Sequence, residues 1–280
     1  MILFPTDFSD SSAKVFPNAL SFAKKAGLGI HIVHFYQVDL GEFHGASNFQ
    51  YTDIEKNLRE QMDGFVDNLP TDPAVKVSHS LEIGFPIQGI KRLSSEDERF
   101  KYILMSTQGQ RNAMEQFFGS IAAEVSVRAN KPVLLIPAEL DYKPVKNIVF
   151  GANKESVHKE SIDKIRPIVN LYGATVHFVY VVDRQIDPKE KEEIREKIIT
   201  ILFDKDVPDF PFEIHFIEDD NVMDGINHYI EEKDAQLAVF CNINRNFWRS
   251  ILHRSLTKRM AMNSKVPLLV IHLSEENTST

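Results

Sequence analysis

The chain of 280 residues has a single cysteine, a single tryptophan and no long hydrophobic run. Because Cys241 has no second cysteine to pair with, no intrachain disulfide can form, and a reducing cytoplasm is the natural compartment. No apolar segment reaches the roughly 20 residues of a membrane-spanning helix. The N-terminal segment MILFPTDFSD also lacks the basic leader of a secretory signal. We therefore expect a soluble, cytoplasmic protein that does not bind membranes.

The chain also has no excess of basic over acidic residues. The chain has 32 Lys and Arg against 40 Asp and Glu, a formal net charge of -8 and a pI near 5.7. This balance argues against a general binder of nucleic acids or anionic membranes, although a local basic patch stays compatible with it. The basic and aromatic segment 245–249 (RNFWR) is interpreted as a solvated loop or a contact between the halves of the chain, not as a nucleic-acid site.

The sequence contains an internal repeat. Three apolar segments of the first half recur in the second: Ile2–Phe4 as Ile148–Phe150, Ile30–Phe35 as Val176–Val181, and Asn130–Ile136 as Lys265–Ile271. The offset is 146 residues for the first two pairs and 135 for the third, so about eleven extra residues lie in the first half, within the polar segment 36–52. Two homologous domains, 1–140 and 141–280, explain the length better than one large domain.

Within each half, short apolar runs alternate with helical patterns. The predicted strands are Ile2–Phe4, Ile30–Phe35, Val75–Leu81, Tyr102–Met105 and Val133–Ile136, then Ile148–Phe150, Val176–Val181, Phe212–Phe216, Leu237–Phe240 and Leu268–Ile271. Helices of the first half are predicted at Ser11–Lys25, Ile54–Leu69, Ile87–Leu93 and Ile121–Ala129. Because strands joined by helices are parallel with right-handed crossovers, we predict an α/β fold with two doubly wound parallel sheets of five strands.

The first helix has start and stop signals of its own. Asp10 or Ser11 is the predicted N-cap, with Asp7 and Ser9 competing for that role, and Gly27 is the predicted C-terminal stop. Taken by itself, Asp7 is an ordinary capping candidate, and capping does not exclude a second role.

The segment 106–120, STQGQRNAMEQFFGS, is the most informative part of the chain. It follows an apolar run and precedes a helical pattern, and Gly109 and Gly119 bracket nine residues before Ser120. Glycines let backbone N–H groups approach an anion, and a helix N-terminus adds unpaired donors and a positive dipole end. Ligands of doubly wound sheets bind beyond the carboxyl ends of the strands, where this segment is predicted to lie. The pattern favours a phosphate site, although such glycine pairs are often simple turns.

Segment 106–120, read as Ser-x-x-Gly-x9-Gly-Ser, resembles the signature of the universal stress protein family, which has glycine in the first position. Further matches are Pro5–Ser9 after the first strand, Gly84-x-Pro86 after the third, and Lys131–Val133 at the start of the last. The resemblance covers essentially the whole chain, as a tandem of two domains. It implies a Rossmann-like fold similar to the adenine-nucleotide alpha hydrolases, and an intramolecular pseudo-dimer that pairs the last strand of each half.

The resemblance also implies a ligand: ATP or another adenine nucleotide, bound with or without Mg²⁺. By position, Asp7 would contact adenine or ribose, Thr6 would flank the base, and Val33 would lie near the adenine. The glycine loop would cradle the phosphates, and the hydroxyl of its last residue would contact a phosphate or a bridging metal ion. The predicted ligand-binding residues are Pro5, Thr6, Asp7, Val33, Ser106, Gly109, Gly119 and Ser120.

The second half departs from the signature. Asn153 stands in place of the aspartate, and the four loop positions hold Cys241, Asn244, Arg254 and Ser255. Arginine in place of the second loop glycine puts a long side chain where backbone would meet phosphate, or fills the anion site with its own charge. We interpret this half as a degenerate domain that supports the fold and a dimer-like architecture.

The leading functional hypothesis is a regulatory stress-response protein that binds ATP in its first half and hydrolyses it slowly, if at all. No catalytic residue is assigned. One alternative is a nucleotide-free scaffold that acts only through contacts with unknown protein partners. Another is an ATPase or nucleotidyltransferase on a related fold, although Pro5–Ser9 matches neither enzyme motif. A further pairing into a homodimer is also compatible with the sequence.

The ten histidines show no convincing metal-binding spacing. His31 and His34 are three residues apart on a predicted strand and point to opposite faces, and His177 occupies the repeat position of His31. We expect no metal site built from histidine. Cys241, next to an apolar strand, is interpreted as a small core residue.

Overall fold

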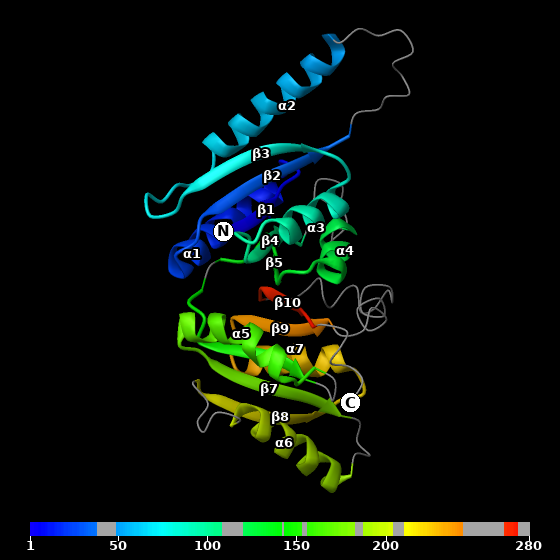
Figure 1. Cartoon of the computed structure of the whole chain (residues 1–280). Coiled ribbons are helices and arrows are strands. Elements are labelled where there is room, and N and C mark those ends of the chain that lie inside the picture. The colour runs from blue at the N-terminus through cyan, green and yellow to red at the C-terminus, as the bar shows by residue number, and fades with distance from the viewer. Residues whose placement is uncertain are drawn as a thin grey trace. The chain divides into compact units, whose positions relative to one another are not determined.

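The computed structural model describes residues 1–37, 49–107, 120–141, 143–152, 156–182, 187–203, 210–242 and 266–273 (Figure 1). The chain divides into two compact units, Met1–Tyr142 and Lys143–Thr280. Both are α/β domains, and they follow one another along the chain.

The first unit is a parallel sheet with helices between its strands. Its strands are β1 (Ile2–Pro5), β2 (Ile30–Tyr36), β3 (Val77–Ile83), β4 (Tyr102–Ser106) and β5 (Val133–Ile136). Its helices are α1 (Asp10–Ala26), α2 (Phe49–Asp67), α3 (Pro86–Glu96) and α4 (Ser120–Arg128). The strand order is β3-β2-β1-β4-β5, with every neighbouring pair parallel. The predicted α/β class and the parallel pairing are confirmed.

The winding of this sheet reverses once. The chain runs from β1 outward to β2 and β3, then returns to place β4 and β5 on the other side of β1. Because crossovers are right-handed, this reversal puts α1 on one face and α3 on the other, as Figure 1 shows. The switch point therefore lies between the carboxyl ends of β1 and β4, where ligands of such sheets bind.

Apolar strands covered on both faces form the core. All four residues of β1 and of β5 are buried, which is typical of parallel strands with helices on either side. Phe4 of β1 meets Phe16 of α1 edge to face, with ring centroids 5.3 Å apart. Continuous apolar runs therefore mark β1 and β5 in the sequence, whereas β3 (VSHSLEI) alternates apolar and polar residues.

Many element boundaries differ from the sequence prediction, and two of the differences have a clear local cause. The N-cap of α1 is Ser9, whose hydroxyl accepts a hydrogen bond from the Ser12 backbone N–H at 3.2 Å, so the prediction of Asp10 or Ser11 was wrong. Both of those residues are already helical, whereas Ser9 is extended. Gly27 ends the helix in the left-handed conformation, with φ of 64°, as predicted. Strand β3 begins two residues later than predicted because residues 72–75 form a turn closed by two hydrogen bonds to Asp72.

The second unit has the same winding. Its strands are β6 (Asn147–Ala152), β7 (Thr175–Val182), β8 (Phe212–Glu218), β9 (Leu237–Asn242) and β10 (Leu268–His272). Its helices are α5 (Lys159–Tyr172), α6 (Pro188–Leu202) and α7 (Val222–Glu232). The order β10-β9-β6-β7-β8 places its switch point between β6 and β9. Each strand therefore has a topological counterpart in the first unit.

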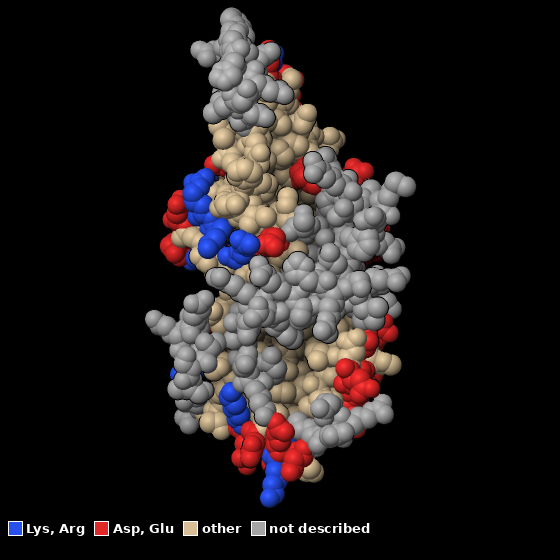
Figure 2. All heavy atoms as spheres, turned by 90° about the vertical axis from the view of Figure 1, so that its right-hand side faces the viewer, with Lys and Arg blue, Asp and Glu red and all other residues tan. Residues whose placement is uncertain are grey.

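Charged side chains of both signs are mixed on the described surface. On the face drawn in Figure 2, Lys and Arg side chains lie in small groups beside Asp and Glu side chains. Surface pairs such as Lys14–Glu139 at 2.9 Å each contribute about 0–1 kcal/mol. Within the described residues, no helix has the length and apolar character needed to cross a bilayer.

Candidate functional site

The turn after β1 is held together by side-chain oxygens. Thr6 Oγ1 accepts a hydrogen bond from the Phe8 backbone N–H at 3.0 Å. Asp7 Oδ1 accepts from the Ser9 backbone N–H and from the Ser12 hydroxyl, both at 3.2 Å. Such local hydrogen bonds are the reason that Thr, Asp and Ser favour turns and helix starts. The segment from Thr6 to Ser9 is therefore a rigid entrance to α1.

An aromatic pair that sequence reasoning missed supports this turn. Phe8 has a φ of 61°, which is strained for a residue with a large side chain and costs about 1–3 kcal/mol. Its ring stacks on His34 of β2, with centroids 4.2 Å apart, and Phe65 of α2 lies 5.7 Å away. His34 Nδ1 also lies 2.8 Å from the Thr6 carbonyl oxygen. The end of β2 thus fixes the conformation of the residues beside Asp7.

Val33 contributes its backbone to the same place. It pairs with Pro5 in the β1–β2 register, and its carbonyl oxygen accepts a hydrogen bond from the Thr6 N–H at 2.9 Å. Its side chain is completely buried. Val33 therefore supports the turn after β1 through its backbone. Its predicted position near an adenine stays a prediction.

The end of β4 supplies small polar residues on the other side of the switch point. Ser106 is the last residue of β4, and both Ser106 and Thr107 are buried. The Thr107 N–H donates to the Ile136 carbonyl oxygen at 3.1 Å, which ties this end to β5. Because β4 lies directly beside β1, Ser106 and Asp7 share the carboxyl edge of the sheet.

Five of the predicted residues therefore meet at one edge: Pro5, Thr6, Asp7, Val33 and Ser106. Of the others, Gly109 and Gly119 lie outside the described residues. Ser120 is the first residue of α4, so a helix does begin where the sequence predicts one. A helix start offers unpaired N–H donors to an anion.

The matching edge of the second unit has different chemistry. Cys241 stands at the repeat position of Ser106, and it is buried, which raises the pKa of its thiol. This confirms Cys241 as a core residue. At the end of β6, a Cβ added to Gly151 would lie 2.5 Å from Phe240 Cε1, so the Phe240 ring occupies the space over this glycine. Asn153, Asn244, Arg254 and Ser255 lie outside the described residues.

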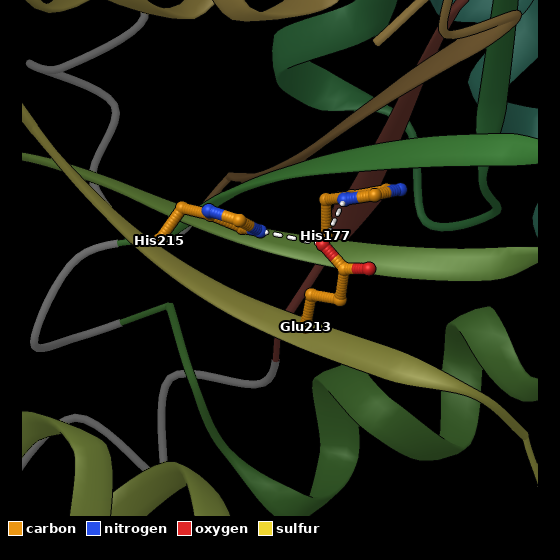
Figure 3. Close-up of side chains that lie close together, drawn as sticks. All are labelled: His177, Glu213 and His215. Carbon is orange, nitrogen blue, oxygen red and sulfur yellow. Dashed lines mark hydrogen bonds and ion pairs between the residues drawn. The ribbon is translucent and has the colours of Figure 1, made fainter.

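A second group of polar side chains was not predicted. His177 of β7 and Glu213 and His215 of β8 bring their ligating atoms within 4.8 Å of one another (Figure 3). His177 is buried, whereas Glu213 is exposed and His215 lies between these extremes. The sequence showed only the alternation Glu213-x-His215 on one strand face. The partner of His177 depends on the register of β7 and β8, which no motif encodes.

Comparison with known proteins identifies a family match in the first half and a curated relative that covers about half of the chain. Residues 1–137 match the profile of the universal stress protein family. Universal stress protein MJ0577 of Methanocaldococcus jannaschii is 25% identical in an alignment of 155 positions that covers 48% of this chain and 93% of that protein.

Solved structures extend the likeness to both halves. A universal stress protein from Archaeoglobus fulgidus matches with a TM-score of 0.68 at 16% identity, over 98% of this chain and 97% of that one. A functionally unknown protein from Pseudomonas aeruginosa matches with a TM-score of 0.58 at 15% identity, over 99% of this chain and 94% of that one. At these identities the two structures show a shared fold for nearly the whole chain.

Proposed function

Since residues 1–137 form a domain of the universal stress protein family, we propose that the chain is a cytoplasmic stress-response protein that binds ATP or another adenine nucleotide in its first half. The observation that carries this proposal is the arrangement at the switch point. Asp7 follows β1, Ser106 ends the neighbouring β4, and both lie at the carboxyl edge where ligands of doubly wound sheets bind.

The described residues fit such a ligand chemically. The Asp7 carboxylate is partly exposed, and a carboxylate accepts hydrogen bonds from a ribose hydroxyl or an adenine amino group. Ser106 is a small residue in the signature's first position, where the family has glycine. At the start of α4, Ser120 and the preceding Gly119 would hold phosphate, with the Ser120 hydroxyl on a phosphate or on Mg²⁺.

The second half is proposed to bind no nucleotide. The Phe240 ring and the buried Cys241 occupy the positions of Met105 and Ser106 at its switch point. We further propose that β5 and β10 pair within one chain as an intramolecular pseudo-dimer, to which a second copy can add. In this proposal the protein binds the nucleotide, regulates protein partners that are not known, and hydrolyses ATP at most slowly.

Calorimetric titration of the full chain with Mg-ATP tests this proposal. We expect one nucleotide per chain, and a thermal shift that reflects about 2.7 kcal/mol of added stability when the free nucleotide is at 100 times its Kd. Absence of both heat and thermal shift at millimolar Mg-ATP would instead support a nucleotide-free scaffold that acts through protein contacts.

Removing the Asp7 carboxylate is expected to weaken this binding. Asp7→Ala should raise the Kd for Mg-ATP about tenfold to a hundredfold, since a hydrogen bond to a charged group contributes about 1.5–3 kcal/mol. Asp10→Ala is the matched control, because Asp10 also lies at the start of α1 but is exposed. Equal Kd values for the two variants would show that Asp7 only shapes the turn.

A further inference from the structure

We propose that His177, Glu213 and His215 bind a divalent transition-metal ion, with Zn²⁺ as the best match, in the second half of the chain. Two imidazoles and one carboxylate are a ligand set that proteins use for Zn²⁺, with a water molecule in the fourth position. The same set suits Fe²⁺ in a facial arrangement. The site is independent of the nucleotide proposal, because its residues come from β7 and β8.

Sheet geometry places the three side chains on one face. In the parallel register His177 lies opposite Glu213, and Val179 lies opposite His215. Because side chains alternate along a strand, Glu213 and His215 point to the same face, and Figure 3 shows both turned toward His177. In the described sheet of this unit β8 is the last strand, so Glu213 and His215 lie at an edge that an ion can reach.

The distances suit a metal ion after small adjustments. Glu213 Oε2 lies 2.8 Å from His215 Nε2 and 3.4 Å from His177 Nδ1. With metal–ligand bonds of about 2.0–2.2 Å, the ligating atoms of a tetrahedral Zn²⁺ site are about 3.3 Å apart. His215 and Glu213 are the two more exposed members, so they are free to make this adjustment around the buried His177.

A chain of hydrogen bonds orients His177 as a ligand. Asn147 Nδ2 donates to the Lys233 carbonyl oxygen at 3.0 Å, which leaves Asn147 Oδ1 facing His177 Nε2 at 3.3 Å. His177 therefore carries its proton on Nε2, and its unprotonated Nδ1 lies 3.0 Å from the Tyr229 hydroxyl and 3.4 Å from Glu213 Oε2. A ligating histidine whose other ring nitrogen donates to an oxygen acceptor is the usual arrangement at metal sites.

This orientation brings two acceptor atoms close enough together for a cation to bind between them. His177 Nδ1 and Glu213 Oε2 are both acceptors and lie 3.4 Å apart. Without a metal, the Tyr229 hydroxyl, 3.0 Å from Nδ1, and His215 Nε2, 2.8 Å from Oε2, can each donate to one of them. A metal ion bound between the two atoms would replace these two donors as the partner of both acceptors.

The first half provides an internal control. His31 occupies the repeat position of His177, but Ser78 and Ser80 stand where the second half has Glu213 and His215. The two serine hydroxyls lie 2.9 and 3.0 Å from the ring nitrogens of His31, so they occupy both of them. At these register positions, which the structure describes in both halves, the two imidazoles and the carboxylate therefore occur in the second half alone.

The test is Zn²⁺ titration of the full chain after removal of bound metal with a chelator. Calorimetry should show one Zn²⁺ per chain in the wild type, and Co²⁺ should give the visible absorption bands of a low-coordinate site. The double variant Glu213→Ser with His215→Ser, which copies the first half, should lose at least about a hundredfold in affinity. Asn147→Leu should lose about 10–100-fold, as expected for the partner that orients a ligand.

Ser78→Ala with Ser80→Ala is the matched control and should leave Zn²⁺ affinity unchanged. Circular dichroism of the metal-free variants checks that each one folds. The proposal is overturned if the wild type shows no visible Co²⁺ bands, or if it binds Zn²⁺ no more tightly than the Glu213→Ser, His215→Ser variant. If that variant fails to fold, the Zn²⁺ and Co²⁺ titrations of the wild type test the proposal by themselves. The metal-binding result does not depend on whether the first half binds ATP.

Discussion

Arginine in place of Gly119 is expected to abolish binding of Mg-ATP. The substitution copies Arg254, which stands at the same signature position in the second half. Gly119 directly precedes the first residue of α4, where the proposed phosphate contacts require the backbone to approach the ligand closely. A side chain at this position fills that space, and calorimetry should show no heat at millimolar nucleotide.

Gly64→Arg is the control for this experiment. Gly64 lies on the exposed part of α2, and a Cβ there would meet no atom within 4 Å, so the same charge and side chain are added away from the site. This variant should bind Mg-ATP as the wild type does. Unchanged affinity of Gly119→Arg would mean that the phosphate loop has been assigned to the wrong segment.

Among Gly→Ala substitutions at the described glycines of the first half, Gly89→Ala should produce the largest loss of stability. A Cβ at this position of α3 would lie 2.0 Å from Phe35 Cε1 and 2.4 Å from Cδ1. Phe35 is buried on β2, so either its ring or the helix must move. Such overpacking costs about 1–3 kcal/mol, which exceeds the roughly 1 kcal/mol that alanine gains over glycine in a helix.

Two glycines allow matched comparisons with Gly89→Ala. Gly64→Ala should raise the free energy of unfolding by about 0.5–1 kcal/mol, because its Cβ meets nothing. Gly225→Ala, on the corresponding helix α7, should have a milder effect than Gly89→Ala, since its nearest neighbours are 3.2 Å away. Urea denaturation, with hydrogen exchange to localise the loss to one domain, gives the comparison. Equal midpoints for Gly89→Ala and Gly64→Ala would contradict it.

The strands could be predicted from the sequence because apolar runs such as Ile2–Phe4 and Val133–Ile136 lie in a sheet that helices cover on both faces. Strand boundaries were less accurate where local hydrogen bonds compete. The turn around Asp72 takes Val75 out of β3, although Val75 is buried and apolar. Burial of a residue therefore did not establish that it belongs to a strand.

The site could be predicted only as far as topology determines it. Placing Asp7 and Ser106 at one edge required only the order of strands and the right-handed crossover. The strained Phe8 and its stack on His34 could not be predicted, because a left-handed conformation goes against the preference of phenylalanine. The His177–Glu213 contact was missed for another reason, since it depends on strand register and not on spacing along the chain.

The most direct test of the nucleotide proposal is a crystal structure of the full chain grown with Mg-ATP. We predict electron density for a purine and ribose beside Asp7, with the phosphates reaching the start of α4 at Ser120, and no nucleotide at the end of β6. A structure in which side chains such as Met114 or Phe118 fill this space, or in which nucleotide binds only the second half, would contradict it.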